Sequence, residues 1–91
     1  MKYKIKATNK FKRNFQLCIK RGYNRELLDD VVNMLGNGQK LPAQYKAHKL
    51  KGEYEDCWEC HIKSDWLLVW KQNEKELILL LIDTGSHSDL F

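Results

Sequence analysis

The chain has 91 residues, 43% of them hydrophobic and 31% charged, with one proline and five glycines. This length and composition predict a single globular domain over residues 1–91 and exclude long disordered stretches. No apolar run approaches the roughly 20 residues that span a bilayer, and no signal-peptide core follows the lysine-rich start. The cysteines, Cys18, Cys57 and Cys60, leave an odd one over, which favours free thiols. We therefore expect a cytoplasmic protein with no membrane partner.

Charge is distributed unevenly along the chain. Residues 1–52 hold 13 Lys and Arg against 3 Asp and Glu, whereas residues 53–91 hold 3 against 9. A basic first half of this kind can meet a polyanion such as a nucleic acid, although lysine-rich helices are commonly only solvated faces. Charge alone therefore leaves both interpretations open.

The chain begins with a predicted strand and a predicted helix. Lysines alternate with less polar residues over 2–7, a period of two that is typical of a strand with one wet face. Apolar residues then recur at helical spacing, with basic residues between them, which predicts a helix over 9–21. Thr8 or Asn9 can cap its start and Gly22 can end it.

A second helix and an irregular connection follow. Asn24 can cap a helix with a continuous apolar stripe that ends at Gly36, and two such helices in succession favour a helical hairpin. The segment 39–52 has no clear period, and Pro42 argues against a central strand there. We expect this segment to be a basic, exposed connection.

The second half of the chain predicts three strands, over 56–62, 66–71 and 77–83. The polar turns between them are so short that neighbouring strands must be antiparallel. The middle strand is apolar without alternation, which is typical of a central strand covered on both faces. The order β-α-α-β-β-β therefore predicts an α+β fold, a twisted antiparallel sheet with an N-terminal helical hairpin packed on one face.

A short motif at Cys57-Trp58-Glu59-Cys60-His61 matches the C-x-x-C-H pattern of covalent haem attachment. Residues three apart on a strand point to opposite faces, so the two cysteines are badly placed to share one haem. A zinc site would need a second pair of ligands at suitable spacing. Haem and zinc remain the weaker alternatives, and we predict no metal and no cofactor.

Three histidines, His48, His61 and His87, all fall outside the predicted helices, in loops or at strand ends where side chains can converge on a cleft. Strand alternation places His61 on the same face as Glu59, and Asp65 follows across a tight turn. These groups suggest acid–base chemistry, although each histidine taken singly is more often a surface residue.

Two stretches, His61–Leu68 and Thr84–Phe91, resemble the YafQ-type toxins of the RelE/ParE superfamily, which are mRNA interferases of type II toxin–antitoxin systems. The upstream residues Leu41-Pro42, Tyr45-Lys46, His48 and Leu50-Lys51-Gly52 are also similar to the family pattern. The resemblance covers essentially the whole chain and implies a RelE-like fold of a small antiparallel sheet with two N-terminal helices. That fold agrees with the element order predicted from periodicity.

The resemblance implies an endoribonuclease that needs no metal or cofactor and cuts mRNA in the ribosomal decoding site. Metal-free RNA cleavage requires a base, an acid and cations near the phosphate, and histidine suits both proton roles. By resemblance His87 is the general acid, and His48, His61 and Asp65 complete the acid–base set. The division of roles among the last three stays open.

The same resemblance implies that Trp66 and Phe91 contact the RNA, where an aromatic ring can stack on a base. Core packing is the alternative for Trp66. The lysines of the basic connection are candidates to hold phosphate or ribosomal RNA, and solvated lysines are the alternative for them. These candidates are Lys46, Lys49 and Lys51.

One position departs from the family pattern, because many relatives carry arginine directly before the terminal Thr-Gly and this chain carries Asp83. A guanidinium that can steady the phosphate in the transition state is therefore missing. We hypothesise that Asp83 lowers the activity without abolishing it, and a lysine from the 46–51 segment is one candidate to substitute.

The resemblance also implies a partner, a cognate antitoxin that binds DNA as a dimer and holds the toxin in a heterotetramer. Free toxin is expected to be a monomer whose other partners are mRNA and the ribosome. The rival interpretation is a non-catalytic module of the same fold that binds RNA, the ribosome or the antitoxin without cutting.

Overall fold

The computed structural model describes all residues from 1 to 91 and confirms the predicted α+β class. None of its helices combines the length and the apolar character needed to cross a membrane. The elements in chain order are β1 (Lys4–Ala7), α1 (Asn9–Lys20), α2 (Arg25–Gly36), the short 3₁₀ helix η1 (Ala43–Tyr45), β2 (His48–Lys49), a second 3₁₀ helix η2 (Gly52–Tyr54), β3 (Trp58–Lys63), β4 (Trp66–Asn73), β5 (Ile78–Gly85) and α3 (His87–Leu90).

The two long helices begin and end where the sequence places their caps. Thr8 is the N-cap of α1, and its hydroxyl accepts a hydrogen bond from the backbone N–H of Phe11 at 3.0 Å. Asn24 caps α2 in the same way by accepting from the N–H of Glu26. Gly22 follows α1 with φ of 91°, a left-handed conformation that costs glycine little and ends the helix.

The sheet has five strands in the order β1-β5-β4-β3-β2. Strands β3, β4 and β5 are antiparallel to one another, as predicted, but β1 pairs in parallel with β5. The sheet is therefore mixed. The expectation of a wholly antiparallel sheet was wrong for β1 because turn length constrains only strands joined by hairpins, whereas two helices separate β1 from the rest of the sheet. The two-residue strand β2, antiparallel to β3, lies in the segment that was expected to be an irregular connection.

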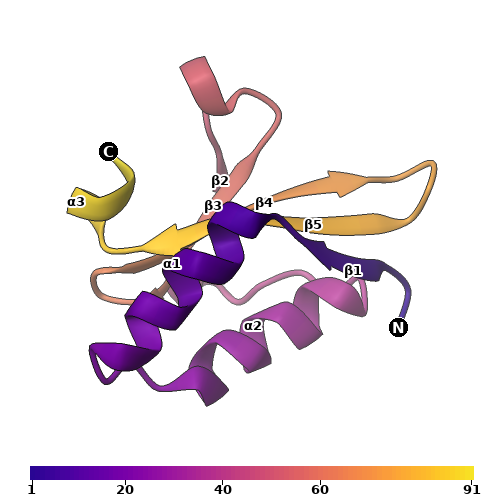
Figure 1. The fold of residues 1–91 in the computed structure, drawn as a ribbon. Helices are drawn as coiled ribbons and strands as arrows, with labels where there is room; N and C mark the ends of the chain where they lie inside the picture. Colours follow the sequence, from indigo (N-terminus) through magenta and orange to yellow (C-terminus); the bar gives the residue numbers. More distant parts are fainter.

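The helices cover one face of the sheet, as predicted. Figure 1 shows α1 and α2 on the same side of the strands, while the loop that carries η2 projects from the other side. Alternate strand residues meet the apolar stripes of the helices in one buried cluster. Its strand members are Cys60, Ile62, Trp66, Leu68, Trp70, Leu79 and Leu81, and its helix members are Phe11, Cys18, Leu28, Val31, Val32 and Leu35.

A β-bulge in β5 changes which side chains face away from the helices. The pairing shifts from Trp70 opposite Leu81 to Val69 opposite Asp83, so Ile82 is an extra residue. Without this bulge, strict alternation from Leu81 would turn Asp83 toward the helices. With it, Asp83 shares with Val69 the sheet face that turns away from the core cluster, which we call the outer face. Two side chains of α1, Lys10 and Asn14, still reach Asp83.

Candidate active site

Paired residues in adjacent strands have their side chains on the same face of the sheet. Residues that are paired from strand to strand across the outer face therefore form a row. One row runs across four strands as His48, Glu59, Val69 and Asp83. Neighbouring strands lie about 4.8 Å apart, which places the backbones of Glu59 and Asp83 roughly 10 Å from each other. An acid–base pair at one end and a buried carboxylate at the other thus flank a buried valine.

His48 and Glu59 form the first contact of this row. The Nδ1 atom of His48 lies 2.9 Å from the carbonyl oxygen of Lys46, so Nδ1 carries a proton and donates. Its Nε2 atom lies 3.4 Å from Oε1 of Glu59, whose side chain is 5% exposed. An imidazole nitrogen and a carboxylate oxygen side by side are the two components of an acid–base pair.

Glu59 is only half satisfied. Its Oε2 atom is buried and has no hydrogen-bond partner. A buried carboxylate oxygen without a partner costs free energy, and such groups are concentrated at functional sites. Glu59 therefore joins the candidate site, although its sequence position marked it only as a neighbour of His61.

The second row of the outer face contains His61, Leu67 and Gly85. Nδ1 of His61 lies 3.3 Å from the carbonyl oxygen of Ser64, which favours the proton on Nδ1 and leaves Nε2 as an acceptor. A pocket of about 200 Å³ beside η1 is lined by both His61 and Lys46. The structure thus brings together one predicted histidine and one predicted lysine.

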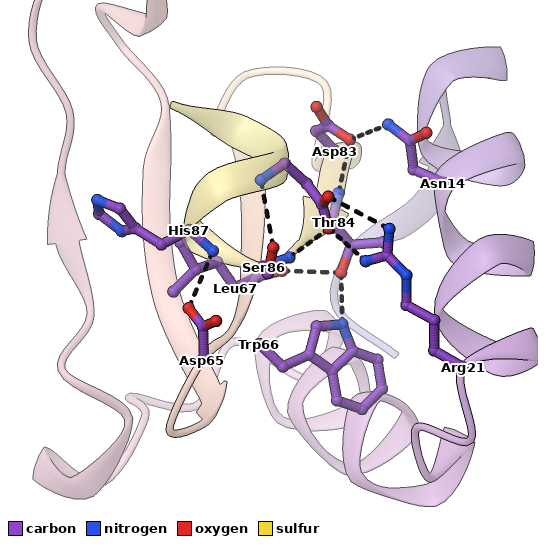
Figure 2. Close-up of polar contacts among 10 residues, drawn as sticks. Asn14, Arg21, Asp65, Trp66, Leu67, Asp83, Thr84, Ser86 and His87 are labelled. Atoms are coloured by element: carbon purple, nitrogen blue, oxygen red, sulfur yellow. Dashed lines mark hydrogen bonds and ion pairs between the residues drawn. The ribbon is translucent and has the colours of Figure 1, made fainter.

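Asp65 and His87 meet through the backbone. Oδ1 of Asp65 accepts a hydrogen bond from the backbone N–H of His87 at 3.0 Å, which fixes the first residue of α3 (Figure 2). The His87 ring is exposed, and its centroid lies 5.4 Å from that of Phe91. Asp65 is therefore placed to position the backbone that carries the His87 ring.

The short helix α3 is held to the body of the protein by charge. Ser86 and Asp89 form a capping box, and the guanidinium of Arg21, the C-cap residue of α1, donates to Asp89 at 2.5 Å. The Arg21 bond and the backbone N–H of Ser86 hold the pKa of Asp89 well below its usual range. Gly85 allows this approach, because a Cβ atom there would lie 2.9 Å from the Asp89 side chain.

The other end of the first row is a saturated carboxylate. Oδ1 of Asp83 accepts from Nδ2 of Asn14 at 2.7 Å and from the backbone N–H of Thr84 at 2.8 Å. Its Oδ2 atom pairs with Nζ of Lys10 at 3.3 Å. The Asp83 side chain is 2% exposed and that of Lys10 is 53% exposed. The carboxylate raises the pKa of Lys10 above its ordinary value, so this ammonium stays charged.

Comparison with known proteins places this site in a family. Residues 3–91 match the family model of a bacterial toxin of type II toxin–antitoxin systems, YafQ. The chain belongs to the YafQ family. It is 31% identical over 88 residues to the mRNA interferase toxin YafQ of Escherichia coli K12, an alignment that covers 96% of this chain and 94% of that relative.

Solved structures of YafQ and of another bacterial toxin share the fold. A metal-bound toxin from Helicobacter pylori superposes with a TM-score of 0.91 at 40% identity and covers 98% of this chain and 99% of its own. YafQ in the DinJ–YafQ toxin–antitoxin complex of E. coli superposes with a TM-score of 0.89 at 28% identity, covering 100% and 99%. The antitoxin partner is thus observed for that relative.

Trp66 is the predicted site residue that the structure places elsewhere. Its side chain lies in the core cluster and is 3% exposed. The ring packs against Tyr23, with centroids 5.0 Å apart, and the indole N–H donates to the Thr84 hydroxyl at 2.9 Å. Figure 2 shows the Trp66 and His87 rings pointing in opposite directions. Core packing and a satisfied hydrogen bond thus occupy this ring, as in the alternative that the sequence left open, and the contact of Trp66 with RNA stays a prediction.

The three predicted lysines do not form one group. Lys46 lines the pocket with His61, whereas Lys49 pairs with Trp58 on the face opposite His48 and holds its ammonium 5.6 Å from the centre of that ring. Lys51 is exposed and directly precedes η2. Of the three, Lys46 is the one that the structure brings to the histidines.

The cysteines are free, as predicted, and all three are buried. Burial raises the pKa of the Cys57 thiol and raises that of Cys60 to about 12. Cys60 belongs to the core cluster on the helix side and Cys57 does not, in agreement with the opposite faces expected for residues three apart. No group of three or more His, Cys, Asp and Glu side chains is arranged to hold a metal ion.

Two site residues had no signal in the sequence. Lys10 is one of several lysines on a basic helix, and only the packing of α1 against β5 brings it to Asp83. Tyr54 lies in the loop that carries η2, with its ring 6.0 Å from the Lys10 ammonium and 5.9 Å from the Phe91 ring. Both depend on contacts between segments far apart in the chain.

Proposed function

We propose that this YafQ-family chain is a ribosome-dependent, metal-independent endoribonuclease that cuts mRNA and so inhibits translation. The observation that carries the proposal is the position of the three histidines. His48 and His61 lie in adjacent rows of the outer face with their Nδ1 atoms at backbone carbonyl oxygens, and His87 follows Gly85 of the second row by two residues, with its backbone N–H bonded to Asp65. The relative named an mRNA interferase supports the same substrate class. Acid–base groups at an RNA phosphate are the minimum that this chemistry needs.

The proposed reaction is an internal transfer at phosphorus. A base removes the proton of the 2′-hydroxyl, and that oxygen attacks the adjacent phosphate. The bond from phosphorus to the 5′-oxygen then breaks, and an acid supplies a proton to the leaving oxygen. The products are a 2′,3′-cyclic phosphate and a 5′-hydroxyl, so the atoms balance without water or a redox partner.

His87 is the proposed general acid. Its ring is exposed at the start of α3, and Asp65 and the Arg21–Asp89 contact hold that helix in place. Phe91 lies beside it with 55% of its surface exposed, which leaves the ring accessible to a nucleotide base. Stacking on such a ring contributes about 1 to 3 kcal/mol per base.

The proposed base is the His48–Glu59 pair, with His61 as the neighbouring group. Glu59 can hold the proton that His48 accepts, or stabilise the imidazolium once it forms. His61 and Lys46 share a pocket and are placed to contact the phosphate or the ribose beside it. Asp65 acts in this scheme by positioning α3.

The proposed regulatory partner is a cognate antitoxin. The complex of the E. coli relative with DinJ supports such a partner, and we propose a heterotetramer in which an antitoxin dimer binds DNA. A protein that binds the folded toxin also stabilises it by mass action. The cytoplasm is the proposed location, because both ribosomes and reduced thiols are found there.

Primer extension on a reporter mRNA in a reconstituted translation reaction tests the function. Wild-type protein, His87→Ala and the matched control Ser88→Ala are compared with and without ribosomes. We expect codon-phased cuts that need ribosomes, persist in the control and vanish in His87→Ala. Cuts that are equally strong in His87→Ala would reject His87 as the acid.

A non-catalytic binding module is the second candidate, favoured by the carboxylate at Asp83 where many relatives have arginine. In that case translation stops without discrete cuts, and the arrest survives the His87→Ala substitution. The same experiment therefore separates the two candidates.

A further inference from the structure

An ammonium group lies on the outer face at a position that the proposed function leaves without a role. Nζ of Lys10 reaches Asp83 at the end of the row that begins with His48. Many relatives have a cation at position 83 itself, and here that position is a buried anion. Asp83 cannot bind a phosphate directly because the two negative charges repel.

Asp83 holds Lys10 in a defined place. Asn14 and the backbone of Thr84 fix the orientation of the carboxylate, so Oδ2 points to the ammonium. The bulge at Ile82 is what turns Asp83 to the outer face. Lys10 thereby gains an anchor while about half of its surface stays open to solvent, which leaves its other donors free for a ligand.

A chain of aromatic contacts connects Lys10 with the proposed general acid. The ammonium lies 6.0 Å from the centre of the Tyr54 ring, the Tyr54 and Phe91 rings are 5.9 Å apart, and Phe91 lies 5.4 Å from the His87 ring. Three segments, α1, η2 and α3, therefore converge on one end of the outer face. A nucleotide whose base meets Phe91 would carry its phosphate within reach of both His87 and Lys10.

We propose that Lys10 supplies the positive charge that the scissile phosphate requires, and that Asp83 is the positioning residue that holds it there. The inference rests on the proposed function and names a residue that the family pattern does not. Lys10 takes no part in proton transfer. It offsets the charge that builds up on the non-bridging oxygens as the 2′-oxygen attacks.

The other candidate cations are less well placed. Lys49 lies on the opposite face over Trp58, and Lys46 lies beside His61 in the second row. The simplest competing explanation for Lys10 is structural: a buried carboxylate needs a counter-ion, and Lys10 provides it. That explanation predicts an effect on stability and none on the rate of cleavage by folded protein.

Single-turnover cleavage at saturating ribosome concentration separates these explanations. The variants are Lys10→Met, Lys10→Arg and the control Lys12→Met, which removes the same charge from an exposed position on the same helix. We expect Lys10→Met to slow the saturated rate by about 10²-fold, as for loss of one transition-state donor. Lys10→Arg should recover most of the rate, and Lys12→Met should leave it within about two-fold. Circular dichroism establishes that each variant is folded at the assay temperature.

A double-mutant cycle tests the role of Asp83. If Asp83 acts by holding Lys10, the Lys10→Met/Asp83→Asn protein cuts no more slowly than Lys10→Met alone. Losses that multiply in the double variant would overturn the positioning role. Equal saturated rates for Lys10→Met and Lys12→Met would overturn the role of Lys10. Cleavage by the wild-type protein in the same experiment would still support the proposed function.

A binding measurement keeps the inference testable apart from cleavage. Adenosine 3′-monophosphate, which carries the phosphate of the cleaved strand, is titrated into each free protein and followed by NMR. We expect the Tyr54, His87 and Phe91 signals of wild type to shift, and the affinity to fall about ten-fold in Lys10→Met but not in Lys12→Met. Equal affinities in the two variants would reject Lys10 as the phosphate contact even if no ribosomal cleavage were seen.

Discussion

The two buried carboxylates of the outer face, Asp83 and Glu59, lie in the same row and differ in how far their oxygens are satisfied. Both oxygens of Asp83 have partners: a side-chain amide and a backbone N–H donate to Oδ1, and an ammonium pairs with Oδ2. Glu59 has one oxygen at 3.4 Å from His48 and one that is buried without a partner. The side chains of Asp83 and Glu59 are both buried, so the number of hydrogen-bond and ionic partners is what distinguishes them.

This difference separates an anchor from a reactive group. A carboxylate whose two oxygens both have fixed partners is held in one orientation, which makes Asp83 suited to hold Lys10. A buried carboxylate with one unpartnered oxygen and an imidazole beside the other has an acceptor position open to a further group, which suits Glu59 to catalysis. Two buried carboxylates in the same row thus have different roles, with Asp83 anchoring Lys10 and Glu59 taking part in the proposed chemistry.

The largest expected effect is on cleavage when Glu59 is made neutral. Glu59→Gln keeps the shape of the side chain but cannot hold a proton for His48, so we expect the saturated cleavage rate to fall by about 10²-fold. Single-turnover cleavage on ribosomes measures it. Glu55→Gln, an exposed neighbour in sequence, is the control and should keep the wild-type rate. A rate for Glu59→Gln equal to that of the control would remove Glu59 from the proposed base.

For the free energy of unfolding we expect the larger loss when Asp83 is made neutral, and not when Glu59 is. Asp83→Asn loses the ionic bond to Lys10 and weakens a charged hydrogen bond, for a loss of about 2 kcal/mol in the free energy of unfolding. Glu59→Gln removes a buried charge with an unpartnered oxygen, and we expect unchanged or slightly raised stability. Urea unfolding monitored by fluorescence compares the two at equal m-value. Equal losses in the two variants would mean that the difference in partners has no energetic consequence.

The local parts of this architecture follow from the sequence, and the long-range parts do not. Caps at Thr8 and Asn24 and the order of elements depend on neighbouring residues, and the structure confirms them. The parallel direction of β1 and the placing of Lys10 depend on how α1 packs against β5, which no local period records.

The candidate site shows the same division. Histidines outside the two long helices could be found because histidine in such positions is a chemical signal by itself, and the family resemblance added the role of His87. The short helix α3 that begins at His87 was not predicted. The outward direction of Asp83 depends on one extra residue in β5, a shift that strict alternation would miss. The unpartnered oxygen of Glu59 could not be predicted from the sequence, because whether a buried oxygen has a hydrogen-bond partner depends on which residues lie next to it in space.

The same comparison can be made for two aromatic residues. Trp66 is buried and its indole N–H has a hydrogen-bond partner, whereas the Phe91 ring is exposed. Trp66→Phe leaves the Thr84 hydroxyl without its indole donor, and we expect a loss of about 1 to 2 kcal/mol in unfolding free energy with cleavage retained. Phe91→Leu should keep the stability and weaken RNA affinity by about 1 kcal/mol or more. Urea unfolding and RNA binding on both variants test this. A Trp66→Phe protein with full stability and lost RNA binding would restore Trp66 to the RNA site.

The smallest expected effect concerns Asp89, a saturated carboxylate at the surface. Because Arg21 holds the folded pKa of Asp89 below its unfolded value of about 3.9, the docking of α3 is fully supported above that value. The support is lost as the pH falls through the lowered folded pKa. NMR shifts of the Ser86 amide, which donates to Asp89, should therefore show a midpoint well below the ordinary carboxyl range as the pH is varied. Arg21→Gln should move the midpoint upward. Arg25→Gln, which breaks the exposed pair with Asp29 and a contact with the Phe15 ring, should leave it in place. A midpoint that Arg21→Gln does not move would show that the pair is screened by solvent and that the capping box alone secures α3.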